Sequence, residues 1–392
     1  MFEDPTPQRL WKRAGRRRTL RPVVYYITAH GYGHGVRSAD ILNAIGKLAP
    51  ETPRIVVSGL SQSFLESRLD APESSLPGTA PPPVRIETRA LDVGMTQLDS
   101  IRIDLTSSRD AAERLLDQWG DLVSREQEFL ESVDAGCVVA DIPAIPLEAA
   151  ARAGRAGVAV GNFGWNWIYE PFAEQDERWK PVVERFARSY ARSRLLLRLP
   201  FAEPMSIFPN REDLPLLSTP ATPRREEIAR LTSADSAKKW VLLSFTSLDW
   251  DAAALDRVES IREVEFFSVE PLVWPGRRIH AIDRRAMRFP EVLASVDAVI
   301  SKPGYGIVSE CITNRKPLLH SARRDFREYP ILVEAIETYL QHRPISEETL
   351  YSGDLAPELE RLWNAPQPRR SMRTGGADVA ARRILDLASR DH

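Results

Sequence analysis

The chain has 392 residues, 53 Lys and Arg against 55 Asp and Glu, 43% hydrophobic residues and two cysteines. This length is too great for one compact domain and predicts two domains of ordinary size. Cys137 and Cys311 lie far apart in the sequence, which excludes a disulfide framework and a CxxC metal site and favours a reducing, cytoplasmic setting. No window approaches the roughly 20 apolar residues that a membrane span needs.

Positive charge is concentrated near the start of the chain. Residues 9–21 hold seven Lys and Arg and no acidic residue, so the rest of the chain has 46 Lys and Arg against 55 Asp and Glu. A mildly acidic body excludes a general nucleic-acid binder, and no nucleic-acid partner is expected. Residues 1–21 are predicted to be a basic arm, either a solvated, flexible tail or a contact with anionic lipid or another anion.

The first predicted unit is a strand at 23–28, a glycine-containing turn, a helix with apolar residues between 39 and 48, and a strand at 54–58. This βαβ order predicts a parallel sheet, whose ligand sites lie at the carboxyl ends of the strands. The Pro/Ser-rich segment 71–83 is predicted to be a surface loop. The alternation continues with helices at 107–133 and 146–153 and strands at 136–140 and 157–161.

A second alternating block follows a proline-rich stretch at 200–223, where the domain boundary is expected. Its predicted strands are 240–245, 264–269, 298–300 and 317–320. The whole pattern predicts an α/β protein of two doubly wound, Rossmann-like domains, 22–215 and 216–374, that face each other across a cleft. A C-terminal helix is expected over 375–392, with Asp378 as its cap.

Two histidines flank glycines directly after the first predicted strand, in the segment His30-Gly-Tyr-Gly33-His34-Gly. The glycines are expected to permit positive φ and close backbone approach in a loop that opens a helix. A loop histidine titrates near neutral pH and can act as a general base, or it can simply hold a structural hydrogen bond. Asp141, at the end of a later strand, is expected to orient His34 or to cap the helix that follows.

The segment 300–310 (ISKPGYGIVSE) delivers a cation and two glycines to the start of a helix. Lys302 and the turn Gly304-Tyr305-Gly306 suit a phosphate, because a helix start offers free N–H groups and a positive dipole end. Glu310, farther along this helix, is expected to accept hydrogen bonds from a ribose, or to be an ordinary surface residue. Asp325 and Glu328, after the next strand, belong either to a ligand site or to a solvated charge run.

The segment 300–330 resembles the donor-binding region of GT-B nucleotide-sugar glycosyltransferases. The resemblance implies that Lys302, Gly304 and Glu310 bind the diphosphate and ribose of the donor, and that Asp325 and Glu328 bind sugar hydroxyls. Gly33-His34 is similar to the Gly-His pair of that family, which implies that His34 is the base and that Asp141 is its partner.

Four segments narrow the resemblance: YYITAHGYGHGVRS (25–38), VVADIPAIPLEAA (138–150), GNFGWNWIYE (161–170) and SKPGYGIVSE (301–310). They are similar to the glycosyltransferase-like domain that precedes the sugar kinase in plant arabinokinases, and to its free-standing bacterial relatives. No kinase half is present in this sequence, so arabinose phosphorylation is not implied.

The sequence departs from the GT-B pattern at two places. Arg37 stands where a proline usually follows the histidine, and Ile307 and Val308 replace hydroxyl residues after the donor glycine. Binding of the diphosphate would then depend on backbone amides, Lys302 and the serines that follow the strand 240–245, namely Ser244 and Ser247.

An acceptor pocket is expected near the first domain's histidines. Trp165, Trp167 and Tyr169 are candidates to stack on a sugar or line this pocket, or to pack in the core beneath it. Asp99 and Asp104 lie in the region where an acceptor loop would fall, although nothing in the local sequence assigns their role.

The resulting hypothesis is an inverting, metal-independent glycosyltransferase that moves a sugar from a UDP-sugar to an acceptor hydroxyl, without a cofactor. The alternatives are a nucleotide-sugar epimerase or hydrolase on the same fold, and a non-catalytic module that binds a nucleotide sugar. The sequence identifies neither the acceptor nor the oligomeric state.

Overall fold

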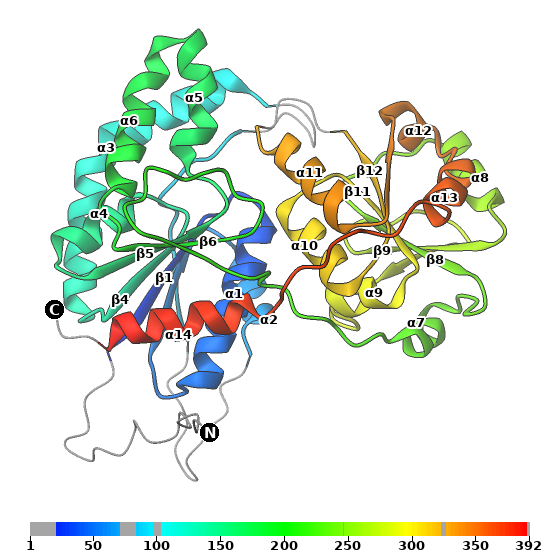
Figure 1. Ribbon diagram of the computed structural model, residues 1–392, viewed down its shortest axis with the longest axis horizontal. Helices are drawn as coiled ribbons and strands as arrows, with labels where there is room; N and C mark the ends of the chain where they lie inside the picture. Colours follow the sequence, from blue (N-terminus) through cyan, green and yellow to red (C-terminus); the bar gives the residue numbers. More distant parts are fainter. Residues whose placement is uncertain (1–20, 71–83, 97–102, 246, 323–326, 390–392) are drawn as a thin grey trace, which may run out of the picture.

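The computed structural model describes residues 21–70, 84–96, 103–245, 247–322 and 327–389. Within them the chain forms two α/β domains, each built on one parallel sheet (Figure 1). The basic arm, except Arg21, and the loop 71–83 lie outside the described residues, as do the candidate residues Asp99 and Asp325.

The first domain contains a seven-stranded parallel sheet in the order β3-β2-β1-β4-β5-β6-β7. Its strands β1, β2, β4 and β5 are buried along their whole length and mostly apolar, as expected for a parallel sheet that helices cover on both faces. The strands are β1 (Val23–Ile27), β2 (Arg54–Ser58), β3 (Arg85–Thr88), β4 (Cys137–Asp141), β5 (Ala156–Gly161), β6 (Leu195–Arg198) and β7 (Arg211–Asp213).

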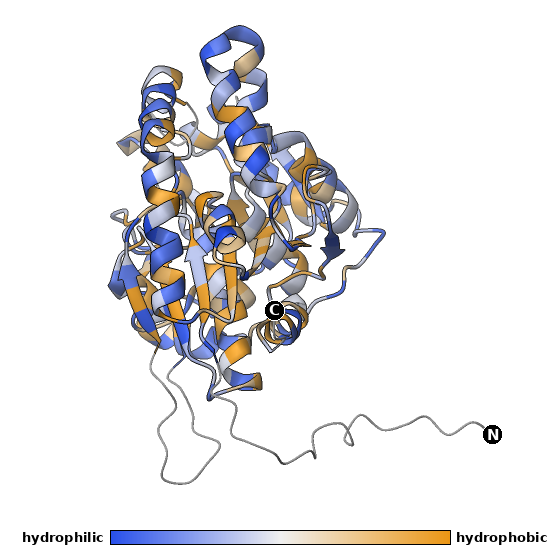
Figure 2. Ribbon diagram, turned by 90° about the vertical axis from the view of Figure 1, so that its left-hand side faces the viewer, coloured by the Kyte–Doolittle hydropathy of each residue, from blue (hydrophilic) through white to orange (hydrophobic). Residues whose placement is uncertain are grey.

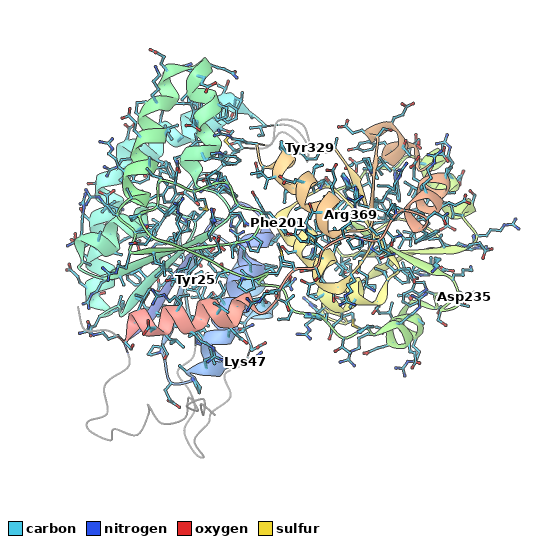
Figure 3. All side chains as sticks on the ribbon, viewed as in Figure 1. Tyr25, Lys47, Phe201, Asp235, Tyr329 and Arg369 are labelled. Atoms are coloured by element: carbon cyan, nitrogen blue, oxygen red, sulfur yellow. The ribbon has the colours of Figure 1, made fainter. Side chains whose placement is uncertain are left out.

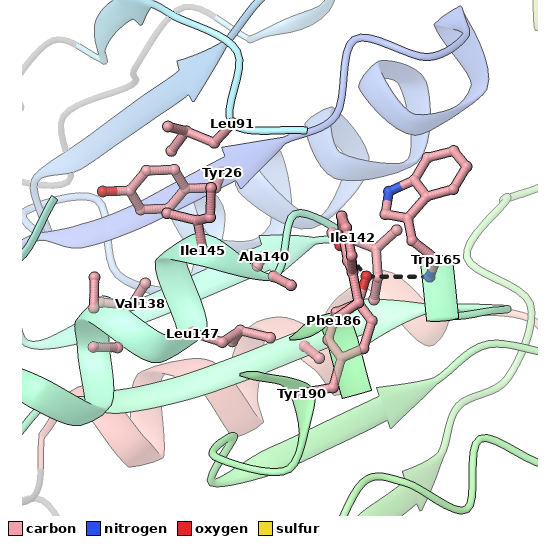
Figure 4. Close-up of a cluster of buried hydrophobic side chains, with 14 of the residues drawn as sticks. Tyr26, Leu91, Val138, Ala140, Ile142, Ile145, Leu147, Trp165, Phe186 and Tyr190 are labelled. Carbon is pink, nitrogen blue, oxygen red and sulfur yellow. Dashed lines mark hydrogen bonds between the residues drawn. The ribbon is translucent and has the colours of Figure 1, made fainter. Parts of the chain in front are cut away.

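Helices cover both faces of this sheet. The helices are α1 (Tyr32–Leu48), α2 (Gln62–Arg68), α3 (Leu105–Ser132), α4 (Ile145–Arg152), α5 (Trp165–Gln175), the 3₁₀ turn η2 (Glu177–Trp179) and α6 (Lys180–Tyr190). Alternate side chains of β1 separate the two cores, since Val24 and Tyr26 pack with α3–α6 whereas Val23 and Tyr25 pack with α1 and α2. Figure 4 shows part of the first core, around Tyr26 and Phe186.

The second domain has a six-stranded parallel sheet in the order β10-β9-β8-β11-β12-β13. The strands are β8 (Lys239–Ser244), β9 (Val264–Val269), β10 (Ile279–Ile282), β11 (Ala298–Ser301), β12 (Leu318–Ser321) and β13 (His342–Ile345). The helices are α7 (Arg225–Thr232), α8 (Ala252–Ser260), α9 (Phe289–Ser295), α10 (Tyr305–Asn314), α11 (Tyr329–Tyr339), α12 (Glu347–Ser352) and α13 (Ala356–Trp363). In the first domain, which faces the viewer in Figure 2, apolar residues lie on the strands and polar residues on the outer faces of the helices.

The chain crosses between the domains twice. It leaves the first sheet after β7, and after α13 it returns to form α14 (Gly376–Ala388), whose Ala380, Ala381 and Ile384 pack against the first domain (Figure 1). Asp378 is not the cap of this helix, because the N-cap position is Gly375 at φ 86°. Phe201 of the first domain contacts Tyr339 of α11 with ring centroids 5.9 Å apart, and Figure 3 shows Phe201 where the two domains meet.

Candidate active site

Both sheets reverse their strand order at a central pair of strands, β1 and β4 in the first domain and β8 and β11 in the second. Ligand sites of doubly wound sheets lie at the carboxyl ends of such a pair. His34 follows β1, and Asp141 is the last residue of β4, directly opposite Ile27 in the sheet register. In the second domain Ser244 ends β8 and Lys302 follows β11.

The histidine segment is mostly helix, which corrects the predicted glycine loop. Helix α1 begins at Tyr32 after Gly31, which alone of the three glycines has a positive φ, 106°. His34 and Gly33 therefore lie in the first helical turn. Gly35 is required by packing, because a Cβ there would lie 2.5 Å from the Phe64 ring of α2.

His34 and Asp141 form a hydrogen-bonded pair. His34 Nδ1 lies 2.8 Å from Asp141 Oδ1, and the side chains are 12% and 0% exposed. Ser38 Oγ donates to Asp141 Oδ2 at 3.0 Å. Asp141 does not cap the next helix, since α4 has Ala144 at its N-cap and no side-chain cap bond. Of the two roles that the sequence left open for this carboxylate, the geometry fits the orientation of His34.

Arg37, which stands where GT-B proteins usually have a proline, is a further member of this cluster. Its Nε donates to Asp141 Oδ2 at 2.6 Å and its Nη2 to Oδ1 at 2.5 Å. Nη1 donates to Asn162 Oδ1 at 2.6 Å. The spacing of three residues from His34 to Arg37 places both on one helix face, which is the sequence signal that could have found this contact.

The charges of this cluster shift its pKa values. Burial and the Arg37 cation lower the pKa of His34, while Asp141 acts in the opposite direction. Burial would raise the pKa of Asp141, but the charges and hydrogen bonds of Arg37 and His34 outweigh it and leave that pKa lowered. These shifts favour a carboxylate on Asp141 and an uncharged imidazole on His34.

A second histidine–carboxylate pair lies beside the first. His30 Nε2 is 3.8 Å from Asp92 Oδ1, and Trp165 Nε1 donates to Asp92 Oδ2 at 3.0 Å. Asp92 is buried, at 5% exposure, and was missed because nothing in its local sequence distinguishes it. The Trp165 amide also hydrogen-bonds the Tyr190 hydroxyl (Figure 4).

Of the three aromatic candidates, two are buried in the core and one is half-buried. Trp165 and Tyr169 are buried and belong to the core of the first domain, where Tyr169 Oη donates to the Gly94 carbonyl at 3.1 Å. Trp167 is half-buried, with the Arg327 guanidinium 4.3 Å from its ring centroid. Asp104 is the N-cap of α3 and accepts the Ser107 N–H at 3.0 Å, so a structural contact accounts for its position.

On the second domain, the turn after β11 leads into α10 as predicted. Gly304 is the N-cap in extended backbone, and no side chain caps the helix start. Lys302 is half-buried next to this turn, and Ser301 Oγ donates to the Ser244 carbonyl at 2.7 Å. Ser247 is exposed in the segment after β8, and Glu328 is half-buried directly before α11.

Glu310 lies where α10 packs against α1, which the sequence did not predict. It is half-buried, and its Oε2 is shielded from solvent without a hydrogen-bond partner among the described residues. Burial and the nearby Asp40 of α1 raise the pKa of Glu310 to about 8, whereas Arg68 of α2 lowers it. Glu310 therefore faces the first domain.

The described residues contain neither a candidate metal cluster nor a candidate membrane span. No group of three or more His, Cys, Asp or Glu side chains among them is arranged to hold a metal ion. None of the helices in that part of the chain is both long and apolar enough to span a bilayer.

Comparison with known proteins gives relatives by sequence and by structure, although no protein-family model matches the chain. An L-arabinokinase of Arabidopsis thaliana is 26% identical over 372 residues, which are 94% of this chain and 34% of that protein. The chain thus spans about a third of the length of this relative.

Solved glycosyltransferases share the whole architecture. The calicheamicin glycosyltransferase CalG4 is 12% identical with a TM-score of 0.55, over 94% of both chains. UGT89C1 of Arabidopsis thaliana, solved with quercetin, is 15% identical with a TM-score of 0.58, over 93% of both chains. A UDP-glucosyltransferase of Polygonum tinctorium is 13% identical with a TM-score of 0.56, over 95% of this chain and 99% of that one. The chain therefore has the GT-B glycosyltransferase fold, as the sequence predicted.

Proposed function

We propose that the protein is a glycosyltransferase that moves a sugar from a nucleoside-diphosphate sugar, with UDP as the nucleotide, to an acceptor hydroxyl. The observation that carries this proposal is the His34–Asp141 pair, buried at the strand-order reversal of one sheet. The second domain presents Lys302 and an uncapped helix start at the equivalent place of its own sheet. We assign residues 22–215 to the acceptor domain and 216–374 to the donor domain.

On the acceptor side, His34 acts as the general base. When Nδ1–H donates to Asp141, Nε2 carries the free lone pair and accepts the proton of the acceptor hydroxyl. The acceptor oxygen attacks the anomeric carbon as the bond to the diphosphate breaks, so that direct displacement inverts the configuration. Positioned bases of this kind supply about 10²- to 10⁴-fold in rate.

On the donor side, the leaving diphosphate receives the electron pair of the broken bond. Its charge is balanced by Lys302 and by the N–H groups at the start of α10, because a helix N-terminus attracts anions. This proposal assigns no step to a metal or cofactor. Glu310, Glu328, Asp325, Ser244 and Ser247 stay candidate donor ligands, although Oε2 of Glu310 is shielded from solvent.

The relatives support the class of reaction more than the substrates. CalG4 is a calicheamicin glycosyltransferase, and the Polygonum tinctorium protein is a UDP-glucosyltransferase that can glucosylate indoxyl. These acceptors belong to those proteins, and no acceptor is assigned to this chain. Cys137 and Cys311 are both free and buried, which fits the cytoplasm as the place of the reaction.

A thermal-shift panel of nucleoside diphosphates and their sugars tests the donor site first. A ligand at 100 times its Kd adds about 2.7 kcal/mol of stability, which a melting curve detects. The best donor is then incubated with pooled sugars, polyols and phenols, and the released nucleoside diphosphate is measured with native protein and with H34A.

We expect H34A to bind the donor as the native protein does and to lose turnover. H342A, in the donor domain, serves as the matched control and should keep both donor binding and turnover. Release without any acceptor would identify a hydrolase, and a rearranged donor sugar would identify an epimerase. Donor binding with no turnover by the native protein under any acceptor would indicate a binding module.

A further inference from the structure

The guanidinium of Arg37 is in contact with both members of the His34–Asp141 pair. Nη2 of Arg37 lies 2.9 Å from His34 Nδ1 and 2.5 Å from Asp141 Oδ1, while that oxygen is 2.8 Å from the same Nδ1. Nη2 of Arg37, Nδ1 of His34 and Oδ1 of Asp141 thus form a triangle of close contacts. Arg37 is held there by its bond to Asn162 as well, and its side chain is only 13% exposed.

This triangle changes what Asp141 can do for His34. In an isolated histidine–carboxylate pair, the carboxylate stabilises the imidazolium that forms when the histidine takes a proton. Here a bidentate guanidinium already balances the charge of Asp141. A positive charge on His34 would face another cation across 2.9 Å in a buried site, which is unfavourable.

We propose that Arg37 is a positioning residue for His34. Arg37 neutralises Asp141 and keeps the His34 imidazole uncharged until the acceptor hydroxyl gives up its proton. The acceptor step of this inference rests on the proposed function. The charge state of His34 does not depend on it. A conventional pair would hold a fraction of its histidine as imidazolium near neutral pH, and that fraction cannot act as a base.

The other charged and titratable groups around His34 do not reverse this conclusion. Asp141 faces it from β4, and Asp92, from the segment after β3, also favours the charged imidazole. Tyr305 of α10 faces Arg37 from the second domain, and burial keeps that phenol protonated by raising its pKa. Burial of His34 and the Arg37 cation outweigh the two carboxylates, so the pKa of His34 is lowered.

The experiment is a pH titration by NMR of protein labelled with ¹⁵N-histidine, without any substrate. The chain has six histidines, and the H34Q variant identifies the resonances of His34 by their loss. Imidazole ¹⁵N shifts report directly whether the ring is charged. We expect His34 of the native protein to be uncharged at pH 7 and to titrate below the ordinary histidine range. A native His34 that is charged at pH 7 would overturn the proposal.

Variants at position 37 separate the cation from burial. R37M and R37Q remove the charge, and R37K keeps it. We expect the His34 midpoint to move to higher pH in R37M and R37Q, because Asp141 is then an unbalanced carboxylate, and to stay near the native value in R37K. An unchanged midpoint in R37M or R37Q would overturn the proposal, and R37Q serves if R37M does not fold.

Arg89 offers a matched control in the same domain. Its guanidinium binds the buried Glu126 in the same bidentate way, with Nε to Oε1 at 2.7 Å and Nη2 to Oε2 at 2.9 Å. R89M should destabilise the domain without moving the His34 midpoint. If R89M moved this midpoint as R37M does, Arg37 would act on His34 only through stability. Because the titration needs no substrate, an uncharged His34 in a protein without transferase activity would overturn the proposed function alone.

Discussion

Tyr305, the first residue of α10 in the second domain, stacks on Phe163 of the first domain with ring centroids 6.2 Å apart and an interplanar angle of 30°. The rings of Phe163 and His34 in turn form a T-shaped pair, with ring centroids 6.1 Å apart and an interplanar angle of 90°. A continuous aromatic contact therefore links the start of the proposed donor helix to the proposed base. Tyr305 packs against the cores of both domains.

Replacement of Tyr305 tests this contact. Y305A should cost on the order of 2 kcal/mol, since the half-buried ring bridges two cores. Y305F should cost little, because the Tyr305 hydroxyl is buried with no hydrogen-bond partner among the described residues. Urea denaturation of the three proteins measures both effects. Equal stability of Y305A and the native protein would show that the ring does not hold the domains together.

Lys302 is expected to contribute to affinity for the donor diphosphate. K302A should weaken binding of the nucleoside diphosphate by roughly 10-fold or more, because a hydrogen bond to a charged group is worth about 1.5–3 kcal/mol. Isothermal titration calorimetry measures the change. K239A is the matched control, since Lys239 is 55% exposed at the start of β8 in the same domain. Equal affinities of K302A and K239A would remove Lys302 from the donor site.

The central strands and the approximate place of the site were predictable because they follow from local patterns. Buried apolar runs marked β1, β4, β8 and β11, and a parallel order brings the ends of such strands together. Five strands of three or four residues were not predicted, namely β3, β6, β7, β10 and β13. In β13, for example, His342–Ile345 includes a proline and two exposed residues, a pattern that does not indicate a strand.

The parts of the site that the sequence could not reveal depend on contacts between distant elements. The role of Arg37 is recognisable only from its contacts with Asp141 and Asn162, which lie 104 and 125 residues away in the sequence. Asp92 is noticeable only because Trp165 donates to it from α5. Glu310 fits the donor-helix pattern of its own domain, but its surroundings belong to α1 and α2 of the other domain.

Glu310 should make the stability of the protein depend on pH. Its pKa of about 8, raised by burial and Asp40, exceeds the ordinary glutamate value of about 4.3, so the folded chain binds this proton more tightly than the unfolded chain. Its contribution to stability is complete below pH ~4.3 and is lost as the pH rises through about 8. E310Q lacks this loss and should melt above the native protein at pH 9, with little difference at pH 5.

Thermal unfolding at pH 5, 7 and 9 measures the effect of E310Q. E334Q removes a carboxylate from an exposed position on α11 and serves as the control, whose melting should follow that of the native protein. If E310Q and E334Q respond alike to pH, Glu310 is ionised at the domain contact without penalty. Glu310 would then be free to meet the donor ribose as a charged acceptor of hydrogen bonds.

Replacement of Trp165 by alanine should lower the free energy of unfolding far more than replacement of Trp167. Trp165 is 5% exposed, lies 5.7 Å from the Tyr169 ring and donates to Asp92, so W165A should cost about 3–5 kcal/mol. Trp167 is half-buried, and Arg327 of the second domain lies over its ring and donates to its carbonyl.

W167A keeps that carbonyl and loses only the cation–π contact and some packing, which is worth about 0.5–1 kcal/mol at an exposed site. Urea denaturation of both variants checks the difference, and W165F separates packing from the hydrogen bond to Asp92 by keeping a ring without the indole N–H. A W167A variant as unstable as W165A would mean that the domain contact through Arg327 stabilises the fold as strongly as the buried core. A mild effect would instead leave Trp167 as a candidate contact for an acceptor, whose ring the fold does not need.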